Sequence, residues 1–157
     1  MKIFVTSDHH FCHKNIIRYC KRPFRSVREM NETMIRRWNK VVDKGDLVFH
    51  LGDFAFANAG VINVIRKRLN GAIIIILGNH DRIYKLKRNG FIITHNKVIR
   101  IGKLLLSHRP LQEVPLNFIN LCGHIHDKKA YGNRINISVD RTNFYPQRIE
   151  KFISNLN

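Results

Sequence analysis

Carboxylate, amide and imidazole side chains follow short apolar segments at five places in the sequence. Residues 72–77, a run too short to span a membrane and without polar alternation, lead into Gly78-Asn79-His80-Asp81. Four other segments end in the same way: residues 2–7 before Asp8 and His10, 46–51 before Gly52-Asp53, 103–107 before His108, and 117–122 before Gly123-His124-Ile125-His126. We expect each segment to be a strand, and ligands bind at the carboxyl ends of strands in open α/β sheets. The five strand ends therefore predict one common site.

The polar groups at these strand ends have the chemistry of a metal site. The candidate ligands are Asp8, His10, Asp53, Asn79, His108, His124 and His126. Carboxylate, imidazole and amide oxygen together suit borderline divalent ions, so we expect Mn²⁺, with Fe²⁺, Zn²⁺, Co²⁺ or Ni²⁺ as alternatives. No cluster of cysteines accompanies them, which argues against a closed structural zinc site. Seven ligands are too many for one ion, whereas two ions that share a carboxylate would use them all and would suit phosphoryl chemistry.

The order of these groups resembles that of the calcineurin-like metallophosphoesterases. The resemblance lies within residues 3–126 and rests on Asp8-x-His10, Gly52-Asp53, Gly78-Asn79-His80-Asp81, His108 and Gly123-His124-x-His126. Residues 7–17 and 138–140 are similar to those of small single-domain members from bacteria and phages. The resemblance implies an α/β (α+β) fold in which residues 1–157 form a single domain. In that α/β/β/α fold, two mixed β-sheets pack as a sandwich flanked by helices.

The resemblance also implies a role for each of these side chains. Two sets of three ligands would each hold one ion: Asp8, His10 and His126, and Asn79, His108 and His124. Asp53 would bridge the two ions, and a hydroxide between them would be the nucleophile. His80 would not bind metal but would contact the scissile phosphate and could protonate the leaving oxygen, since the pKa of imidazole lies near neutrality.

One position departs from the pattern of many protein phosphatases in this family. Those relatives have Gly-Asp-x-x-Asp, whose second aspartate orients the catalytic histidine. Here the sequence reads Gly52-Asp53-Phe54-Ala55-Phe56, and a phenylalanine cannot accept that hydrogen bond. Another group must orient His80, unless that residue acts mainly as a phosphate ligand. The departure argues against a protein phosphatase and favours a diesterase or a nucleotide-directed enzyme.

Several other polar side chains flank the motifs. We name His13 and Arg82 as substrate-binding residues that could reach the phosphate, with ordinary surface positions as the alternative. Asp81 and Asp140 could orient ligand histidines, as metal sites commonly require. We expect structural roles for the remaining histidines His9, His50 and His95.

The rest of the sequence predicts the elements that carry the site. We expect helices over residues 15–21 and over 61–70, the latter with Gly71 at C′. Another helix should begin after an N-cap at Ser26, with Glu29 completing a capping box, and a short helix should follow Asp81 as far as residue 90. A last helix should begin at Pro146 and carry Ile149, Phe152, Ile153 and Leu156 on one stripe. We expect strands over residues 91–95, 97–107 with a hairpin turn at 101–103, and 134–139. Two packed sheets with helices outside would accommodate this order.

The length and composition are those of one globular domain. With 157 residues, of which 44% are hydrophobic, the chain can bury about 68–70% of its unfolded surface. No apolar run approaches the roughly 20 residues of a membrane helix, and the N-terminal residues have no signal-peptide pattern. The three cysteines lack Cys-x-x-Cys spacing, which fits reduced thiols. We therefore expect a cytoplasmic protein with no membrane partner and no obligate protein partner.

The charge of the chain indicates the class of substrate. Lysine and arginine number 28 against 11 acidic residues, a net charge of +17, which favours a polyanionic partner and nucleic acid first. A compositional bias is the alternative, since the chain is also rich in Ile and Asn. We expect a dinuclear metal-dependent phosphohydrolase, foremost a phosphodiesterase acting on a nucleotide or nucleic-acid phosphate. The alternatives are a phosphomonoesterase or pyrophosphohydrolase acting on a small metabolite, and a non-catalytic nucleic-acid-binding or scaffold protein of the same fold.

Overall fold

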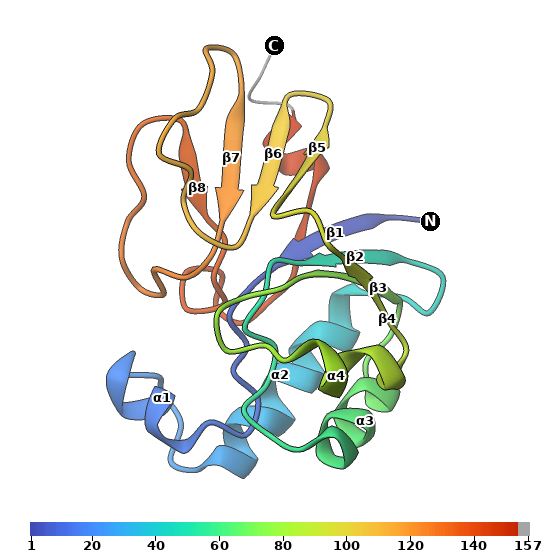
Figure 1. Ribbon diagram of the computed structural model, residues 1–157. Coiled ribbons are helices and arrows are strands. Elements are labelled where there is room, and N and C mark those ends of the chain that lie inside the picture. The colour runs from blue at the N-terminus through green and yellow to red at the C-terminus, as the bar shows by residue number, and fades with distance from the viewer. Residues whose placement is uncertain (154–157) are drawn as a thin grey trace.

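The computed structural model describes residues 1–153, whose strands form two mixed sheets (Figure 1). The first sheet consists of β1 (Ile3–Thr6), β2 (Leu47–His50), β3 (Ala72–Ile76), β4 (Phe91–Thr94) and β9 (Gln147–Arg148). Its order is β4-β3-β2-β1-β9, and β9 runs antiparallel to β1 while the other pairs are parallel. The second sheet consists of β5 (Val98–Ile101), β6 (Leu104–Ser107), β7 (Ile119–Cys122) and β8 (Arg134–Asn136), in that order. The hairpin of β5 and β6 is antiparallel and the other pairs are parallel.

Helices flank the sheets, as predicted. The helices are α1 (Lys14–Tyr19), α2 (Val27–Val41), α3 (Ala59–Arg68), α4 (Ile83–Leu86), the 3-10 helix η1 (Lys87–Asn89) and α5 (Glu150–Ile153). Helices α2 and α3 lie on the face of the first sheet that is turned away from the second sheet (Figure 1). Among residues 1–153, no helix is long and apolar enough to cross a membrane.

Two helix ends differ in detail from the prediction. Ser26 caps α2 by accepting the Glu29 N–H at 3.1 Å, but the Glu29 carboxylate accepts from Arg25 N at 2.8 Å rather than from Ser26. Helix α3 has its C-cap at Leu69, so Gly71 is not C′. Gly71 instead adopts φ +85° in the turn into β3, where a side chain would press against Asp46 O.

The C-terminal segment corrects two further predictions. Pro146 does not begin a helix, because the next two residues form β9 and pair with the otherwise open edge of β1. Helix α5 begins only at Glu150, and Leu156 lies outside the described residues. Strand β8 ends at Asn136, three residues earlier than predicted, because the chain there leaves the second sheet to form a bridge between Ser138 and Ser7.

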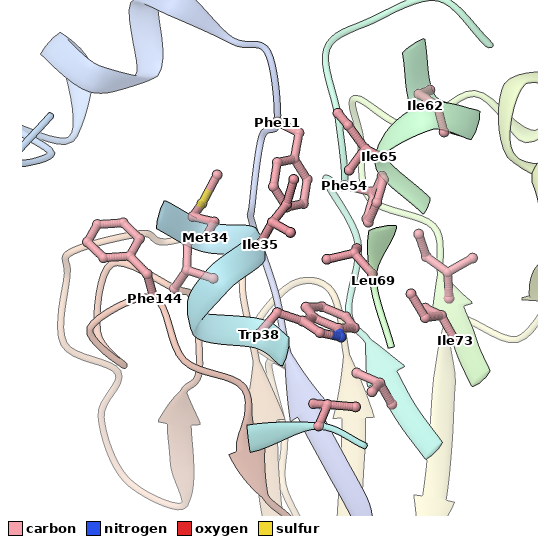
Figure 2. Packing of buried hydrophobic residues seen from close by; sticks show 14 of the residues in the cluster. Phe11, Met34, Ile35, Trp38, Phe54, Ile62, Ile65, Leu69, Ile73 and Phe144 are labelled. Atoms are coloured by element: carbon pink, nitrogen blue, oxygen red, sulfur yellow. The ribbon is translucent and has the colours of Figure 1, made fainter. Parts of the chain in front are cut away.

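Alternation along the strands divides the hydrophobic core into two layers. The layer between the first sheet and the helices surrounds Trp38, which is fully buried and donates its indole N–H to Asn70 O at 2.9 Å (Figure 2). The layer between the two sheets includes Val5 and Phe49 from the first sheet and Leu106 from the second. The two sheets therefore pack as a sandwich.

The strand registers bring the polar strand ends together. Thr6, His50 and Ile75 are aligned across β1, β2 and β3, so these strands end at one edge of the first sheet. Ser107 and Cys122 are aligned at the ends of β6 and β7. Side chains that follow β1, β2, β6 and β7 meet in shared clusters, and Asn79 after β3 contacts His108 after β6. The two edges therefore open onto the same end of the sandwich.

The Asp81 carboxylate connects the loops that follow β2 and β3. It is buried and accepts the backbone N–H groups of Asp53 at 2.7 Å, Phe54 at 3.0 Å and Gly78 at 2.9 Å. We expected Asp81 to orient a ligand histidine, and this expectation was wrong. The sheets leave these three donors unpaired, and buried backbone donors require an acceptor.

His9 and His50 form a buried hydrogen-bonded pair beside these loops. His9 Nδ1 lies 2.9 Å from His50 Nε2, and the Gly52 N–H donates to His50 Nδ1 at 3.2 Å. Because His50 Nδ1 accepts a hydrogen bond, its Nε2 carries the proton and donates to His9. Burial lowers the pKa of His9 well below 6.5 and that of His50 to about 3, so both rings are neutral at pH 7. Neither ring belongs to a ligand cluster of the described residues, which agrees with a structural role.

Replacing Asp81 should destabilise the fold. Asp81→Ala leaves three buried N–H groups without their acceptor, and we expect a loss of about 3 kcal/mol in the free energy of unfolding. Urea unfolding of the metal-free protein measures this loss. The exposed Asp127→Ala variant is the control and should change the free energy by less than about 0.5 kcal/mol. Equal stability of the two variants would contradict this role of Asp81.

The neutral His50 ring should make the fold sensitive to acid. Below pH 6.5 the unfolded chain binds a proton at His50, whereas the folded protein binds one there only near pH 3. The pKa of His50 is therefore lower in the folded protein than in the unfolded chain. As a result, His50 lowers the free energy of unfolding by about 1.4 kcal/mol for each pH unit below 6.5. We expect the metal-free His50→Gln variant to lose stability less steeply than wild type by about that amount per unit, in urea unfolding between about pH 5 and pH 7. The exposed His95→Gln variant should keep the wild-type slope, and an unchanged slope in His50→Gln would contradict the prediction.

Candidate metal centre

Six of the seven predicted ligands lie in two compact groups. One group is Asp8, His10 and His126, and the other is Asp53, His108 and His124; within each group the ligand atoms lie within 4.8 Å of one another. Each group combines side chains that follow strands of both sheets. The groups therefore form only when the sandwich closes.

Asp53 lies between the two groups. Its Oδ2 atom is 3.4 Å from His10 Nε2 and 3.6 Å from His108 Nε2, while Oδ1 accepts the His80 N–H at 2.9 Å. Burial by itself would raise the pKa of the Asp53 carboxyl, but His10 and the charge of His108 hold that pKa well below its usual value. One ionised carboxylate oxygen consequently faces both groups.

Asn79, the seventh predicted ligand, joins the group of His108. His108 Nδ1 lies 2.7 Å from Leu51 O, so Nδ1 carries a proton and Nε2 is the ring nitrogen whose lone pair could bind a cation. That nitrogen lies 3.0 Å from Asn79 Oδ1. A nitrogen lone pair and an amide oxygen that face each other suit the ligation of one cation.

Asp140 orients His126, as predicted. Its Oδ2 atom lies 3.1 Å from His126 Nδ1, which leaves Nε2 to face Asp8 and His10. Burial opposes a charge on His126, but the contacts with Asp140 and Cys20 raise the pKa of the imidazole to about 10. A metal at this group must therefore displace a proton from His126, so its affinity will fall as the pH falls.

Arg22 supports this arrangement, although nothing in the sequence pointed to it. Its guanidinium donates to both oxygens of Asp140, at 2.7 and 3.0 Å, and to the backbone carbonyls of Asp8 and His9, each at 2.8 Å. The sequence around Arg22 indicates only that a helix ends before Pro23, and Asp140, the partner of Arg22, is 118 residues away. Cys20, His126 and Asp140 form a third cluster of possible metal ligands. Because the positive charge of Arg22 neutralises Asp140, we interpret this cluster as part of the support of His126 and not as a metal site.

The backbone of the site adopts a rare conformation. Five of the seven predicted ligands have a positive φ: Asp8 at 59°, His10 at 49°, Asp53 at 55°, His124 at 69° and His126 at 50°. Residues other than glycine rarely occupy this left-handed region, and each instance costs about 1–3 kcal/mol. Such strain concentrates at functional sites, where surrounding contacts hold it in place.

Two glycines of the motifs allow the loops to approach one another. A Cβ atom at Gly78 would collide with the Asp53 carboxylate, and one at Gly123 would collide with the side chains of Ser7 and Asp8. Glycine beside these ligands is therefore required by close packing.

The residues predicted to contact substrate lie around the two groups. His80 is exposed, its ring centroid lies 5.4 Å from that of His10, and within residues 1–153 its imidazole makes no hydrogen bond. The His13 ring lies 5.5 Å from that of His10. Arg82 is exposed and its guanidinium is turned back toward Asn79 O and Asp81 O, each at 3.4 Å. All three positions border the site, and their roles stay predictions.

Phe56 occupies the surroundings of His80 in place of an acidic partner. Its ring meets that of His80 edge-on at 6.5 Å between centroids and stacks on His13 at 4.7 Å. The His80 imidazole is thus flanked by the rings of Phe56 and His10, and its backbone is held by Asp53. Packing of rings and the Asp53 hydrogen bond position His80 here.

The donor set fits two divalent ions. His10 Nε2 is buried and has no hydrogen-bond partner in the described part of the chain, since its contact with Asp53 is too long. Carboxylate oxygens and imidazole nitrogens make up the two groups, without a lysine or arginine in either, and the Asn79 amide oxygen adjoins the second group. A bound ion would account for the unpaired His10 Nε2 atom.

Comparisons with known proteins agree with this geometry. The chain is 37% identical to the uncharacterized protein MJ1445 of Methanocaldococcus jannaschii over 164 aligned positions, which cover 97% of this chain and 89% of that protein. The crystal structure of AQ665 from Aquifex aeolicus, a protein of unknown function, is similar with a TM-score of 0.76 and 26% identity over 99% of both chains. Residues 1–155 match the calcineurin-like phosphoesterase family, and the chain therefore belongs to that family.

Proposed function

We propose that the protein is a dinuclear metal-dependent phosphodiesterase that acts on nucleotide or nucleic-acid phosphates. The observation that carries this proposal is the position of Asp53 Oδ2, within 3.6 Å of a histidine of each ligand group. A single carboxylate oxygen that reaches both groups is what two neighbouring ions require of a bridging ligand. Membership of the calcineurin-like phosphoesterase family supports hydrolysis of phosphoric esters.

Two sets of ligands would hold the ions, with Asp53 common to both: Asp8, His10 and His126, and Asn79, His108 and His124. Two divalent ions, Mn²⁺ in our proposal, would polarise the phosphoryl oxygens and lower the pKa of the attacking water. Asp140 and Leu51 O keep His126 and His108 in the tautomers that point Nε2 at the site. The protein thereby presents its ligands already oriented.

His80 would donate a proton to the leaving oxygen. It is exposed at the border of the site, and its backbone N–H is held by the same Asp53 carboxylate that faces both ligand groups. An imidazole in this place can also contact the phosphate directly, as the family resemblance implies. A proton donor matters most for a substrate with a poor leaving group, whereas a phosphate contact matters equally for every leaving group.

Two hollows beside the site support a diester substrate. The Phe56 hollow, about 270 Å³, is lined by Phe56, His80, Arg82 and Lys85 among others. The Arg109 hollow, about 850 Å³, is lined by Asn79, Lys97, His108 and Arg109 among others. A phosphomonoester has one organic group to accommodate, whereas a diester has two. Basic side chains in both hollows would contact neighbouring phosphates.

We also propose that the protein works in the cytoplasm. The three cysteines are all free, and none is paired in a disulfide. Unpaired thiols are typical of reducing compartments.

Two variants should separate ion binding from proton donation. Asp53→Asn weakens the shared ligand, so we expect loss of bound Mn²⁺ by metal analysis and loss of turnover. His80→Asn should keep both ions but lower kcat about 10²–10⁴-fold for a dinucleotide, whose alkoxide leaving group needs a proton. The same variant should slow a bis(nitrophenyl) phosphate far less, because nitrophenolate leaves without protonation. Equal slowing of both substrates would assign His80 to phosphate binding, and full turnover of Asp53→Asn would contradict the shared-ligand mechanism.

Salt dependence should reveal a polynucleotide substrate. If basic groups contact successive phosphates, KM for a single-stranded oligonucleotide will rise steeply with salt, with a log–log slope of about 0.7 per contact. Arg109→Gln should reduce that slope by about 0.7, while Lys44→Gln, exposed in the loop before β2, should leave it unchanged. A flat response in wild type would contradict a polynucleotide and favour a nucleotide-sized substrate.

A further inference from the structure

Exposed aromatic rings lie side by side at the border of the candidate metal centre. Phe56 is 57% exposed and Tyr19 is 62% exposed, although large apolar rings are usually buried. The His13 ring lies between them, stacked on Phe56 at 4.7 Å with an angle of 28° and edge-on to Tyr19 at 6.3 Å. We call Phe56, His13 and Tyr19 the aromatic row.

The Phe56 hollow adjoins this row on the side of His80. Its apolar lining includes Phe56 and the buried side chains of Ile62 and Leu86. Its polar lining comes from His80, Asp81, Arg82 and Lys85. A volume of about 270 Å³ lies just below the usual range of small-molecule sites, so it suits one planar ring system rather than a lipid chain. An aromatic wall beside a guanidinium is the surface on which unstacked nucleobases are commonly bound.

The backbone holds this wall rigidly in place. Phe56 N donates to Phe11 O at 2.8 Å, and Phe11 and Ala55 form a bridge between the loops after β1 and β2. Lys85 Nζ donates to Ala57 O at 2.9 Å and ties the same loop to α4. Because the wall is preorganised, a ligand that stacks on Phe56 would not have to order the loop.

We propose that the Phe56 hollow binds a nucleobase of the substrate, stacked on the Phe56 ring, while the phosphate occupies the metal centre. This inference rests on the proposed function and names the substrate class as a nucleotide ester. His80 links the two parts, since it lines the hollow and lies 5.4 Å from the His10 ring. The residue that replaces the second aspartate of the protein-phosphatase motif is thereby the residue that selects the substrate.

Binding by the Mn²⁺-loaded protein tests the inference without turnover. Calorimetry compares adenosine 5′-phosphate with ribose 5-phosphate, which has the same phosphate and sugar but no base. We expect wild type to bind the nucleotide at least about tenfold more tightly, as stacking on one aromatic side chain provides. Phe56→Leu should remove this preference, whereas Phe56→Tyr should keep it.

An exposed aromatic residue outside both hollows provides the control. Tyr131 is 78% exposed and lines neither hollow, so Tyr131→Leu should retain the full preference. Equal affinities of wild type for the two ligands would overturn the base site, and this comparison needs no variant to fold.

Hydrolysis of a dinucleotide distinguishes failure of this inference from failure of the proposed function. If the protein hydrolyses the dinucleotide with metal but binds adenosine 5′-phosphate and ribose 5-phosphate equally well, the phosphodiesterase proposal stands and the base site is overturned. Base-dependent binding that Phe56→Leu abolishes, without hydrolysis under any divalent ion, would support the base site and reject the enzyme.

Discussion

The site depends on one buried carboxylate that holds another in place. Asp81 accepts the backbone N–H groups of Asp53, Phe54 and Gly78, and so fixes the loops after two neighbouring strands against each other. Only then does Asp53 Oδ2 lie between His10 and a histidine from the second sheet. Both carboxylates are buried, and buried anions require hydrogen-bond donors around them. The chain meets this requirement with three backbone N–H donors for Asp81 and with the backbone N–H of His80 for Asp53.

A second constraint operates on the other ligand group. Arg22 donates to the backbone carbonyls of Asp8 and His9 and to the Asp140 carboxylate. Asp140 in turn orients His126. A buried guanidinium that satisfies three acceptors at once is effective because its donors form a rigid planar fork. Such contacts hold the strained backbone at the candidate ligands, so several residues of a small domain can keep a left-handed conformation in one place.

Phe56 gives the border of the site a different surface from that of relatives with Gly-Asp-x-x-Asp. An aspartate in that place would orient His80 by a hydrogen bond, whereas the phenylalanine contacts the rings of His80 and His13. The border of the site becomes apolar and aromatic, while Arg82 and the basic chain as a whole keep it attractive to phosphates. This combination favours a substrate that carries both a planar ring and a phosphate.

The sequence by itself determined most of the strands, their polar ends and the candidate ligands, because these signals are local. The apolar run before Gly78 predicts a buried strand, and the residue types that follow it predict metal chemistry without knowledge of their partners. Only the tertiary structure decided the role of Asp81, the link from Arg22 to Asp140, the His9–His50 pair and the pairing of β9 with β1. Each of these joins residues far apart in the chain. A single side chain carries no sign of which distant backbone groups folding will leave unpaired beside it.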